Sequence, residues 1–155
     1  MLCVKNVSLR LPESCLLTNV NFTVDKCDIV TLMGPSGCGK STLLRVAARL
    51  MAPERGEVRI EGQDVSRLSA KQFARLAALL PQSRPLPGIT AGSLVLHGRF
   101  PYLGYPRRYS REDREAARQA MERTGVAGLE GVPMAHLSGG QRQKVYLAMA
   151  LAQDT

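Results

Sequence analysis

A glycine-rich stretch in the first third of the chain carries residue types suited to phosphate binding. Residues 34–42 read GPSGCGKST, which fits the pattern G-x-x-x-x-G-K-[ST]. Gly37 and Gly39 let the backbone curl so that successive N–H groups point inward at phosphate oxygens. Lys40 is expected to reach the β- and γ-phosphates as a point charge, and the Ser41 hydroxyl to coordinate Mg²⁺. The stretch therefore predicts a site for a nucleoside triphosphate.

The elements on both sides favour this interpretation over a glycine-rich turn without a ligand. Residues 28–33 (DIVTLM) form a short apolar run that ends at Gly34, and such a run predicts a buried parallel strand. A helix is predicted from about residue 41 to residue 51, before Pro53, and its N-terminus adds partial positive charge. The residues predicted to hold the phosphates and Mg²⁺ are Gly34, Pro35, Ser36, Gly37, Cys38, Gly39, Lys40, Ser41 and Thr42.

A second stretch, residues 137–144 (LSGGQRQK), also resembles an anion site. Ser138 and Gln141 predict a capping box, which by itself indicates only an ordinary helix start. Gly139 and Gly140 then occupy the first turn, and each costs about 1 kcal/mol against alanine in a helix interior. Two glycines behind a serine leave bare N–H groups and a hydroxyl at a positive helix end. We therefore expect a second phosphate-facing site here.

The remaining pattern is that of an α/β protein. Residues 2–9 alternate in polarity and predict a strand, which pairs with residues 16–24 as an antiparallel hairpin across the turn at 12–14. Residues 56–62 predict a further strand closed by a glycine turn. Strands cluster before residue 82 and helices after it, so we expect an α/β core with an inserted helical subdomain.

Three capping boxes mark the predicted helix starts. Ser69 with Gln72 begins the first of these helices, and Ser110 with Asp113 begins a helix over residues 110–124. The third helix is predicted over residues 137–153. In the helix over 110–124, one face is apolar and carries Ala116, Ala117, Ala120 and Met121.

Composition limits the classes of protein and partner. The 155 residues suit one domain, with 45% apolar residues and a net charge of +8. We find no zinc spacing and no aromatic-rich basic stripe, so nucleic acid is not an expected partner. Cysteines stand at 3, 15, 27 and 38 without a CxxC pair, and reduced thiols are expected. No signal peptide is visible, and the longest apolar run, residues 145–152, is too short to span a bilayer.

Three motifs in this order carry a family resemblance. The stretch GPSGCGKST, Gln82 after an apolar segment, and LSGGQRQ resemble the nucleotide-binding domain of ABC transporters over the whole chain. The resemblance implies a P-loop NTPase core with an antiparallel β-hairpin subdomain at 1–87, a helical subdomain at 88–137 and the signature helix at 138–155. The stretches LPQ, GRFPYLGY and LSGGQRQKVYLAMALAQDT are similar to the ATPases of importers for iron–siderophores, haem and cobalamin.

This resemblance implies roles for particular residues. ATP with Mg²⁺ would lie in a head-to-tail dimer, where the signature of one subunit caps the γ-phosphate on the phosphate loop of a second nucleotide-binding subunit. The residues implied to act across that interface are Ser138, Gly139, Gly140 and Gln141. Lys40 and Gln82 would be catalytic, and Gln82 with Ser41 would serve Mg²⁺. Gln82 and the segment Ile89 to Tyr105 would face integral-membrane permease subunits, which places the chain peripherally on the cytoplasmic face of the plasma membrane.

Several positions depart from the family pattern. Leu11 stands near the place where the family stacks adenine on an aromatic ring, and Cys27 replaces the usual glycine before the phosphate-loop strand. A cysteine there would be strained if φ is positive. The family's later apolar strand closing in Asp-Glu and its switch histidine are not recognisable, since Asp154 follows no such strand and His97 and His136 precede the signature helix.

The departures at the end of the sequence lead to an expectation about activity. The 155-residue chain is expected to be a C-terminally truncated ATPase domain and to be inactive. Two alternatives remain open. One is a non-catalytic nucleotide-binding fragment, which an ATPase assay would distinguish. The other is a genome-maintenance ATPase of related architecture, in which long coiled coils separate the two motifs, whereas no heptads occur here.

Overall fold

The computed structural model describes residues 1–11, 14–82 and 86–155, with the side chains of residues 11–15 outside the description. The chain divides into two compact units, Met1–Phe73 and Ala74–Thr155. The subdomain boundaries predicted at 87/88 and 137/138 stay predictions.

The first unit is built on an antiparallel sheet. Strand β1 (Leu2–Leu11) pairs antiparallel with β2 (Ser14–Val24), which confirms the predicted hairpin, while Pro12 and Glu13 of its turn lie outside the described residues. Strand β3 (Arg55–Ile60) pairs with β1, and the short β4 (Gln63–Asp64) pairs with β3. The strand order is therefore β2-β1-β3-β4.

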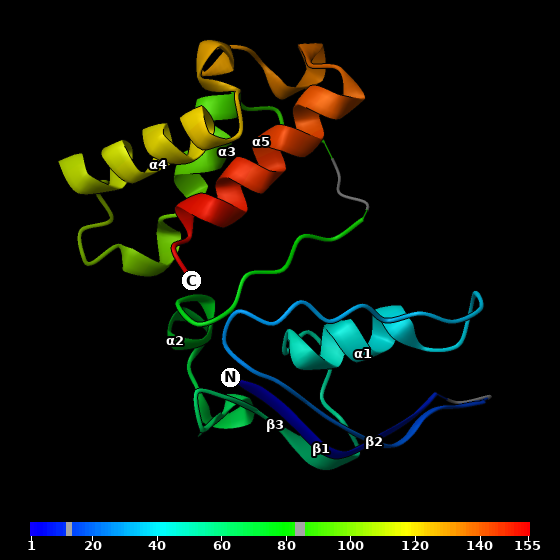
Figure 1. The fold of residues 1–155 in the computed structure, drawn as a ribbon. Coiled ribbons are helices and arrows are strands. Elements are labelled where there is room, and N and C mark those ends of the chain that lie inside the picture. Colours follow the sequence, from blue (N-terminus) through cyan, green and yellow to red (C-terminus); the bar gives the residue numbers. More distant parts are fainter. Residues whose placement is uncertain (12–13, 83–85) are drawn as a thin grey trace. The chain divides into compact units, whose positions relative to one another are not determined.

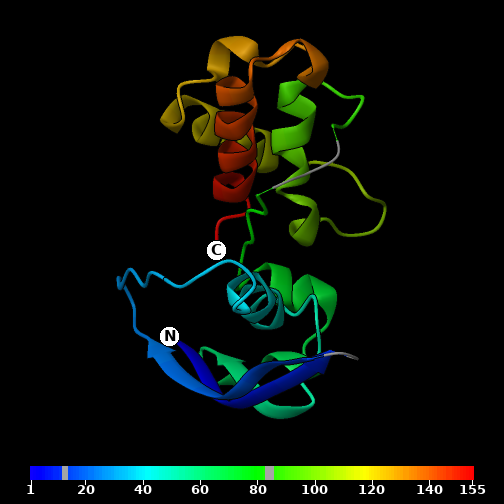
Figure 2. The ribbon, with the colours of Figure 1, turned by 90° about the vertical axis from the view of Figure 1, so that its right-hand side faces the viewer.

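Helix α1 (Lys40–Ala47) lies over one face of this sheet (Figures 1 and 2). Its Leu43 and Val46 are buried, as are the sheet residues Val4, Val7 and Val58. The helix ends four residues before the predicted Met51. Arg49 adopts φ +58, and the N–H groups of Arg49 and Leu50 donate to the carbonyls of Val46 and Arg45. This is a Schellman motif, which usually has glycine where Arg49 stands, so it could not be predicted from the residue types.

Residues 28–33 differ from the prediction. They form no strand, and Ile29 and Met33 are 95% and 88% exposed. A strand needs hydrogen-bonding neighbours for its N–H and C=O groups. Among the described residues no strand pairs with this segment. The apolar run therefore predicted a buried parallel strand wrongly, because apolar character does not by itself supply a partner.

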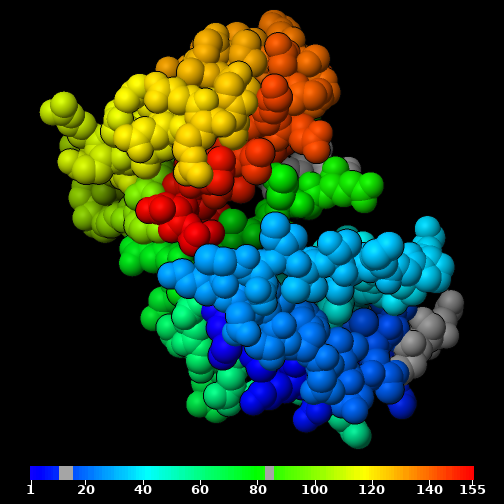
Figure 3. Space-filling model, in the orientation of Figure 1, coloured from blue at the N-terminus to red at the C-terminus, as the bar shows by residue number. Residues whose placement is uncertain are grey.

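The second unit is helical and has its own core. Helices α3 (Ala91–His97), α4 (Arg111–Arg123) and α5 (Gly139–Ala152) pack on one another, and α4 and α5 lie side by side in Figure 3. The capping boxes at Ser110 and Ser138 are confirmed. The buried core residues are Ala91, Leu94, Val95, Ala117, Ala120, Met121, Val126, Met134, Leu137, Val145, Ala148 and Ala152.

Short helical segments complete the described chain. Helix α2 (Ala70–Ala74) begins with the predicted box, since the Ser69 N–H donates to Gln72 Oε1 at 2.8 Å and the Gln72 N–H to Ser69 Oγ at 3.2 Å. Within the described ranges, no helix has the length and apolar character to cross a membrane. The 3₁₀ segments are η1 (Val65–Arg67), η2 (Phe100–Tyr102), η3 (Ala127–Leu129) and η4 (Met134–His136).

Candidate functional site

The phosphate loop has the predicted curl. Gly37 adopts φ +82 and Gly39 φ +93, values that only glycine adopts without strain. A Cβ added at Gly39 would lie 2.9 Å from the Leu16 carbonyl oxygen and 3.1 Å from Leu17 Cδ2. Conformation and close approach both require glycine at 39, and the contact seats the loop against strand β2.

The Lys40 side chain folds back over this loop. Its Nζ donates to the carbonyl oxygens of Gly34 at 2.8 Å and Pro35 at 2.7 Å. Lys40 is also the first residue of α1 and is followed by the hydroxyls of Ser41 and Thr42. One short segment therefore gathers an ammonium group, a helix N-terminus and two hydroxyls, which are groups that fit phosphate oxygens and Mg²⁺.

The signature helix α5 starts with glycines that its own chain does not require. Ser138 Oγ accepts from the Gln141 N–H at 3.3 Å, and the Ser138 N–H donates to Gln141 Oε1 at 2.9 Å. A Cβ at Gly139 or Gly140 would meet nothing within 4 Å, and neither residue has positive φ. By contrast, a Cβ at Gly98 would lie 2.3 Å from the Met149 carbonyl oxygen. The first turn of α5 is thus left bare and exposed.

Gln82 lies beside this helix start, within the second unit. It borders a hollow of about 490 Å³ together with residues from α5. Arg142 stands in the wall of the hollow, where its Nε donates to the Leu137 carbonyl at 2.8 Å. The residues that line the hollow are Leu80, Pro81, Gln82, Gly139, Arg142, Gln143 and Tyr146.

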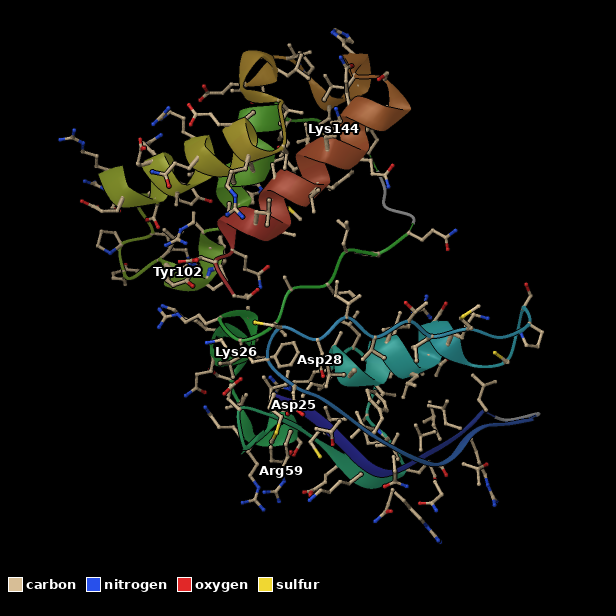
Figure 4. All side chains as sticks on the ribbon, in the orientation of Figure 1. Asp25, Lys26, Asp28, Arg59, Tyr102 and Lys144 are labelled. Atoms are coloured by element: carbon tan, nitrogen blue, oxygen red, sulfur yellow. The ribbon has the colours of Figure 1, made fainter. Side chains whose placement is uncertain are left out.

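The two departures from the family pattern have different outcomes. The Leu11 side chain lies outside the described residues, so its predicted contact with adenine stays a prediction. Cys27 adopts φ +69 in a turn where the Asp28 N–H donates to the Asp25 carbonyl at 3.2 Å. Figure 4 labels Asp25 and Asp28 at this turn. Cys27 therefore has the positive φ that, by the prediction, would strain a cysteine at this position. The three cysteines whose side chains the structure describes, Cys3, Cys27 and Cys38, are free thiols.

A buried ionic cluster in the second unit was not predicted. Arg99 and Asp113 are 9% and 7% exposed, with Arg99 Nε 3.0 Å from Asp113 Oδ1. Arg99 stacks over Tyr102, its guanidinium carbon 3.8 Å from the ring centroid. Tyr102 lies near the end of α5 (Figure 4), and its hydroxyl donates to the carbonyls of Gln153 and Asp154. Asp113 was predicted to form a capping box with Ser110, but nothing in the sequence identifies Arg99 as a further partner of its carboxylate.

The sequence also contains a stretch rich in arginine and aromatic residues that the sequence analysis did not identify. Residues 99–111 read RFPYLGYPRRYSR, with four arginines and four aromatic residues and no acidic residue. The interpretation that the chain has no aromatic-rich basic stretch is therefore wrong. Phe100 is 49% exposed and Tyr105 is fully exposed, so part of this stretch is available to a partner.

Comparison with known proteins places the fold and the motifs in one class, the ATP-binding cassette. The family model described as ABC transporter matches residues 17–155. A dimeric ATP-binding cassette, MJ0796, in a post-hydrolysis state bound to ADP and Pi, aligns with a TM-score of 0.81 and 30% identity, over 99% of this chain and 70% of that one.

Sequence relatives agree with this class. The iron(3+)-hydroxamate import ATP-binding protein FhuC of Bacillus subtilis is 39% identical, over 99% of this chain and 58% of its own length. The ferric enterobactin transport ATP-binding protein FepC of Escherichia coli is 44% identical, over 87% of this chain and 51% of its own length. The chain belongs to the ABC transporter family and has the partial P-loop NTPase fold of its ATP-binding subunits. It spans about half the length of these two relatives.

Proposed function

We propose that this chain is the nucleotide-binding part of an importer ATPase. That ATPase binds ATP with Mg²⁺ and, as a whole protein in a head-to-tail dimer, hydrolyses ATP to drive transport through a partner permease. The observation that carries the proposal is the bare start of α5. Gly139 and Gly140 are dispensable for packing and for conformation within the chain, yet each costs helix stability. A ligand or partner outside the chain accounts for them.

The residues divide into two nucleotide-facing sets. Lys40 and the N–H groups of the loop hold the β- and γ-phosphates, while Ser41 and Gln82 hold Mg²⁺, which neutralises charge on the phosphates when bound. The loop residues in this role are Gly34, Pro35, Ser36, Gly37, Cys38, Gly39 and Thr42. The signature residues Ser138, Gly139, Gly140 and Gln141 cap the γ-phosphate of a second subunit. Gln141 contributes indirectly: its Oε1 accepts the Ser138 N–H, and this bond holds Ser138 at the start of α5.

The names of the relatives support a proposal for the transported substrate. Names of the similar proteins include iron(3+)-hydroxamate import and ferric enterobactin transport, so we assign an iron–siderophore type of substrate to this chain. Under this proposal the subunit lies peripherally on the cytoplasmic face of the plasma membrane. Gln82 and the segment Ile89 to Tyr105 face the permease, and the dimeric MJ0796 cassette supports pairing of two nucleotide-binding subunits.

Titration with a fluorescent ATP analogue tests the proposal. Lys40→Ala removes the charge matched to the β- and γ-phosphates, so its affinity should fall at least about tenfold. Lys5→Ala, which removes an exposed lysine on β1, is the matched control and should bind as the wild type does. Identical titration curves for Lys40→Ala and the wild type would refute the nucleotide site.

A non-catalytic role for the isolated chain is the second candidate. Hydrolysis needs a carboxylate to orient the attacking water. Asp154 is the only acidic residue after the signature, and it follows helix α5 and not a strand. We propose that the purified 155-residue chain releases phosphate from ATP no faster than a Lys40→Ala control. Steady Mg²⁺-dependent turnover, abolished by Lys40→Ala, would contradict this.

A further inference from the structure

A cavity of about 320 Å³ lies in the first unit, at the far end of α1 from the phosphate loop. Its walls come from the turn after α1, from β3 and from η1. Val46, Val58 and Val65 line it and are 1%, 3% and 5% exposed. Few voids in close-packed protein interiors exceed the size of a water molecule, whereas this volume falls in the range of small-molecule sites. The cavity is therefore large enough for a small ligand with an apolar body.

Arg49 also lines this cavity, and its backbone conformation is unusual for an arginine. It has φ +58, a value at which the Cβ of an L-residue is strained. The turn is held by main-chain bonds, since the Arg49 N–H donates to the Val46 carbonyl at 3.0 Å. Glycine would make the same bonds without the strain. The turn by itself therefore does not account for an arginine here, whereas a role for the guanidinium group does.

A second charged residue of this unit, Glu61, has a similar conformation at φ +49. Its carboxylate binds the ammonium group of Met1, so a partner within the chain accounts for its side chain. Within the described part of the chain, no carboxylate forms an ion pair with Arg49. An anionic partner for this guanidinium group would therefore come from outside the chain.

Two acidic residues border the cavity, but their carboxylates have other partners. Glu57 and Val58 are neighbours on β3, so their side chains lie on opposite faces of the sheet. The Glu57 carboxylate accepts a hydrogen bond from Arg59 Nη2 at 2.9 Å. Asp64 Oδ1 accepts from the N–H and the O–H of Ser66 at 2.9 and 2.7 Å. The cavity therefore combines apolar walls with one guanidinium group that neither carboxylate neutralises.

We infer that this cavity binds a small aliphatic carboxylic acid in its ionised form. A guanidinium group pairs with a carboxylate through two parallel hydrogen bonds, and an alkyl chain placed against the valines is removed from water. A compact, strongly hydrated anion such as phosphate would leave the apolar walls without a partner, and a neutral hydrocarbon would leave Arg49 without one. The inference does not depend on the nucleotide site, which lies at the other end of α1.

Titration with hexanoate at neutral pH, followed by ligand-detected NMR on the 155-residue chain, tests this inference. Hexanoate should bind at least about tenfold more tightly than hexanamide, which lacks the charge, and than acetate, which lacks the alkyl chain. Arg49→Gly should weaken hexanoate binding at least about tenfold and raise the temperature of thermal unfolding, because glycine adopts φ +58 without strain. Arg49→Lys keeps the charge but loses the planar fork, so it should weaken binding about threefold.

The control and the opposing outcomes separate the cavity from general charge effects. Arg45→Ala removes an exposed arginine in the last turn of α1 that does not line the cavity, so it should change the affinity by less than about twofold. Unchanged hexanoate binding by Arg49→Gly, equal losses in Arg49→Gly and Arg45→Ala, or equal affinities for hexanoate and hexanamide would overturn the inference. So would a lower unfolding temperature of Arg49→Gly, because the helix end itself would then need the arginine. An ATP-analogue titration reports separately on the nucleotide site, which Arg49→Gly should leave intact.

Discussion

Arg99 Nη1 donates a hydrogen bond to the main-chain carbonyl of Ala152 at 3.0 Å. The last carbonyls of a helix have no partner within the helix, so this bond satisfies one of them at the end of α5. The same guanidinium binds Asp113, the third residue of α4, whose carboxylate also accepts the N–H of the N-cap residue Ser110. One buried side chain therefore fixes the end of the signature helix against the start of its neighbour.

Asp113→Asn should destabilise the chain by about 3 kcal/mol, because it leaves the buried Arg99 without its charge partner. The asparagine retains an oxygen that can accept the Ser110 N–H, so the loss reports on the ion pair more than on the cap. Urea unfolding measures the change. Glu115→Gln alters an exposed pair with Arg118 and should cost less than about 1 kcal/mol. Equal losses in the two variants would contradict the role given to the buried pair.

The contribution of Asp113 should depend on pH. Burial raises the pKa of Asp113, but the bonds from the Ser110 N–H and from Arg99 outweigh burial and hold that pKa below its ordinary value of 3.8. A group whose pKa is lowered by folding stabilises the fold above its unfolded pKa, and this stabilisation is lost as pH falls through the folded pKa. The urea midpoints of the wild type and Asp113→Asn should therefore begin to approach one another as pH falls below about 3.8, and a constant gap would contradict this.

Cys27→Gly should stabilise the chain by about 1 kcal/mol, because it relieves a side chain held at φ +69. Lys26→Gly is the matched control. Lys26 occupies the adjacent turn position without positive φ, so glycine there only adds freedom to the unfolded chain and should destabilise. Thermal unfolding of the two variants measures the difference. Destabilisation by Cys27→Gly would show that the turn holds the cysteine without strain.

Two glycine substitutions on contacting helices should have opposite effects. Gly140→Ala places a methyl group in open space at the start of α5 and should stabilise the chain by up to about 1 kcal/mol. Gly98→Ala would force a Cβ to within 2.3 Å of the Met149 carbonyl oxygen and should destabilise it. Chemical unfolding distinguishes the two. A loss of stability in Gly140→Ala would mean that the glycine is needed within the chain after all.

Leu11→Tyr should tighten ATP binding if residue 11 faces adenine, since stacking of an aromatic ring on a base is worth about 1–3 kcal/mol. Lys5→Tyr places the same ring elsewhere on β1 and should have no effect. The measurement is the ATP-analogue titration described above. Equal affinities for the two tyrosine variants would refute the placement of adenine at residue 11.

Local signals in the sequence predicted the elements that local chemistry determines. The capping boxes at Ser69, Ser110 and Ser138 formed as predicted, because each pairs groups only three residues apart. The hairpin of β1 and β2 also formed. The curl of the phosphate loop could be predicted because glycine marks positive φ directly.

Features that depend on distant partners could not be predicted in the same way. Residues 28–33 have apolar character but no pairing strand, and a sequence window contains no information about such a partner. Arg99 gave no sign of its bonds to Asp113 and Ala152, since 14 and 53 residues separate them. The motif residues Lys40 and Ser138 were recognisable because their neighbours in the sequence mark them.

The unpaired segment before the phosphate loop has a practical consequence for solution experiments. Among the described residues, none accepts a hydrogen bond from the main-chain N–H groups of residues 29–33. These amides should exchange with deuterium almost as fast as those of an unfolded peptide, while the paired amides of β1 exchange slowly. Because the segment leads directly into Gly34, a decrease in its deuterium uptake would report any ligand that orders the loop, without an attached dye. Mass spectrometry can measure that uptake without any substitution in the site.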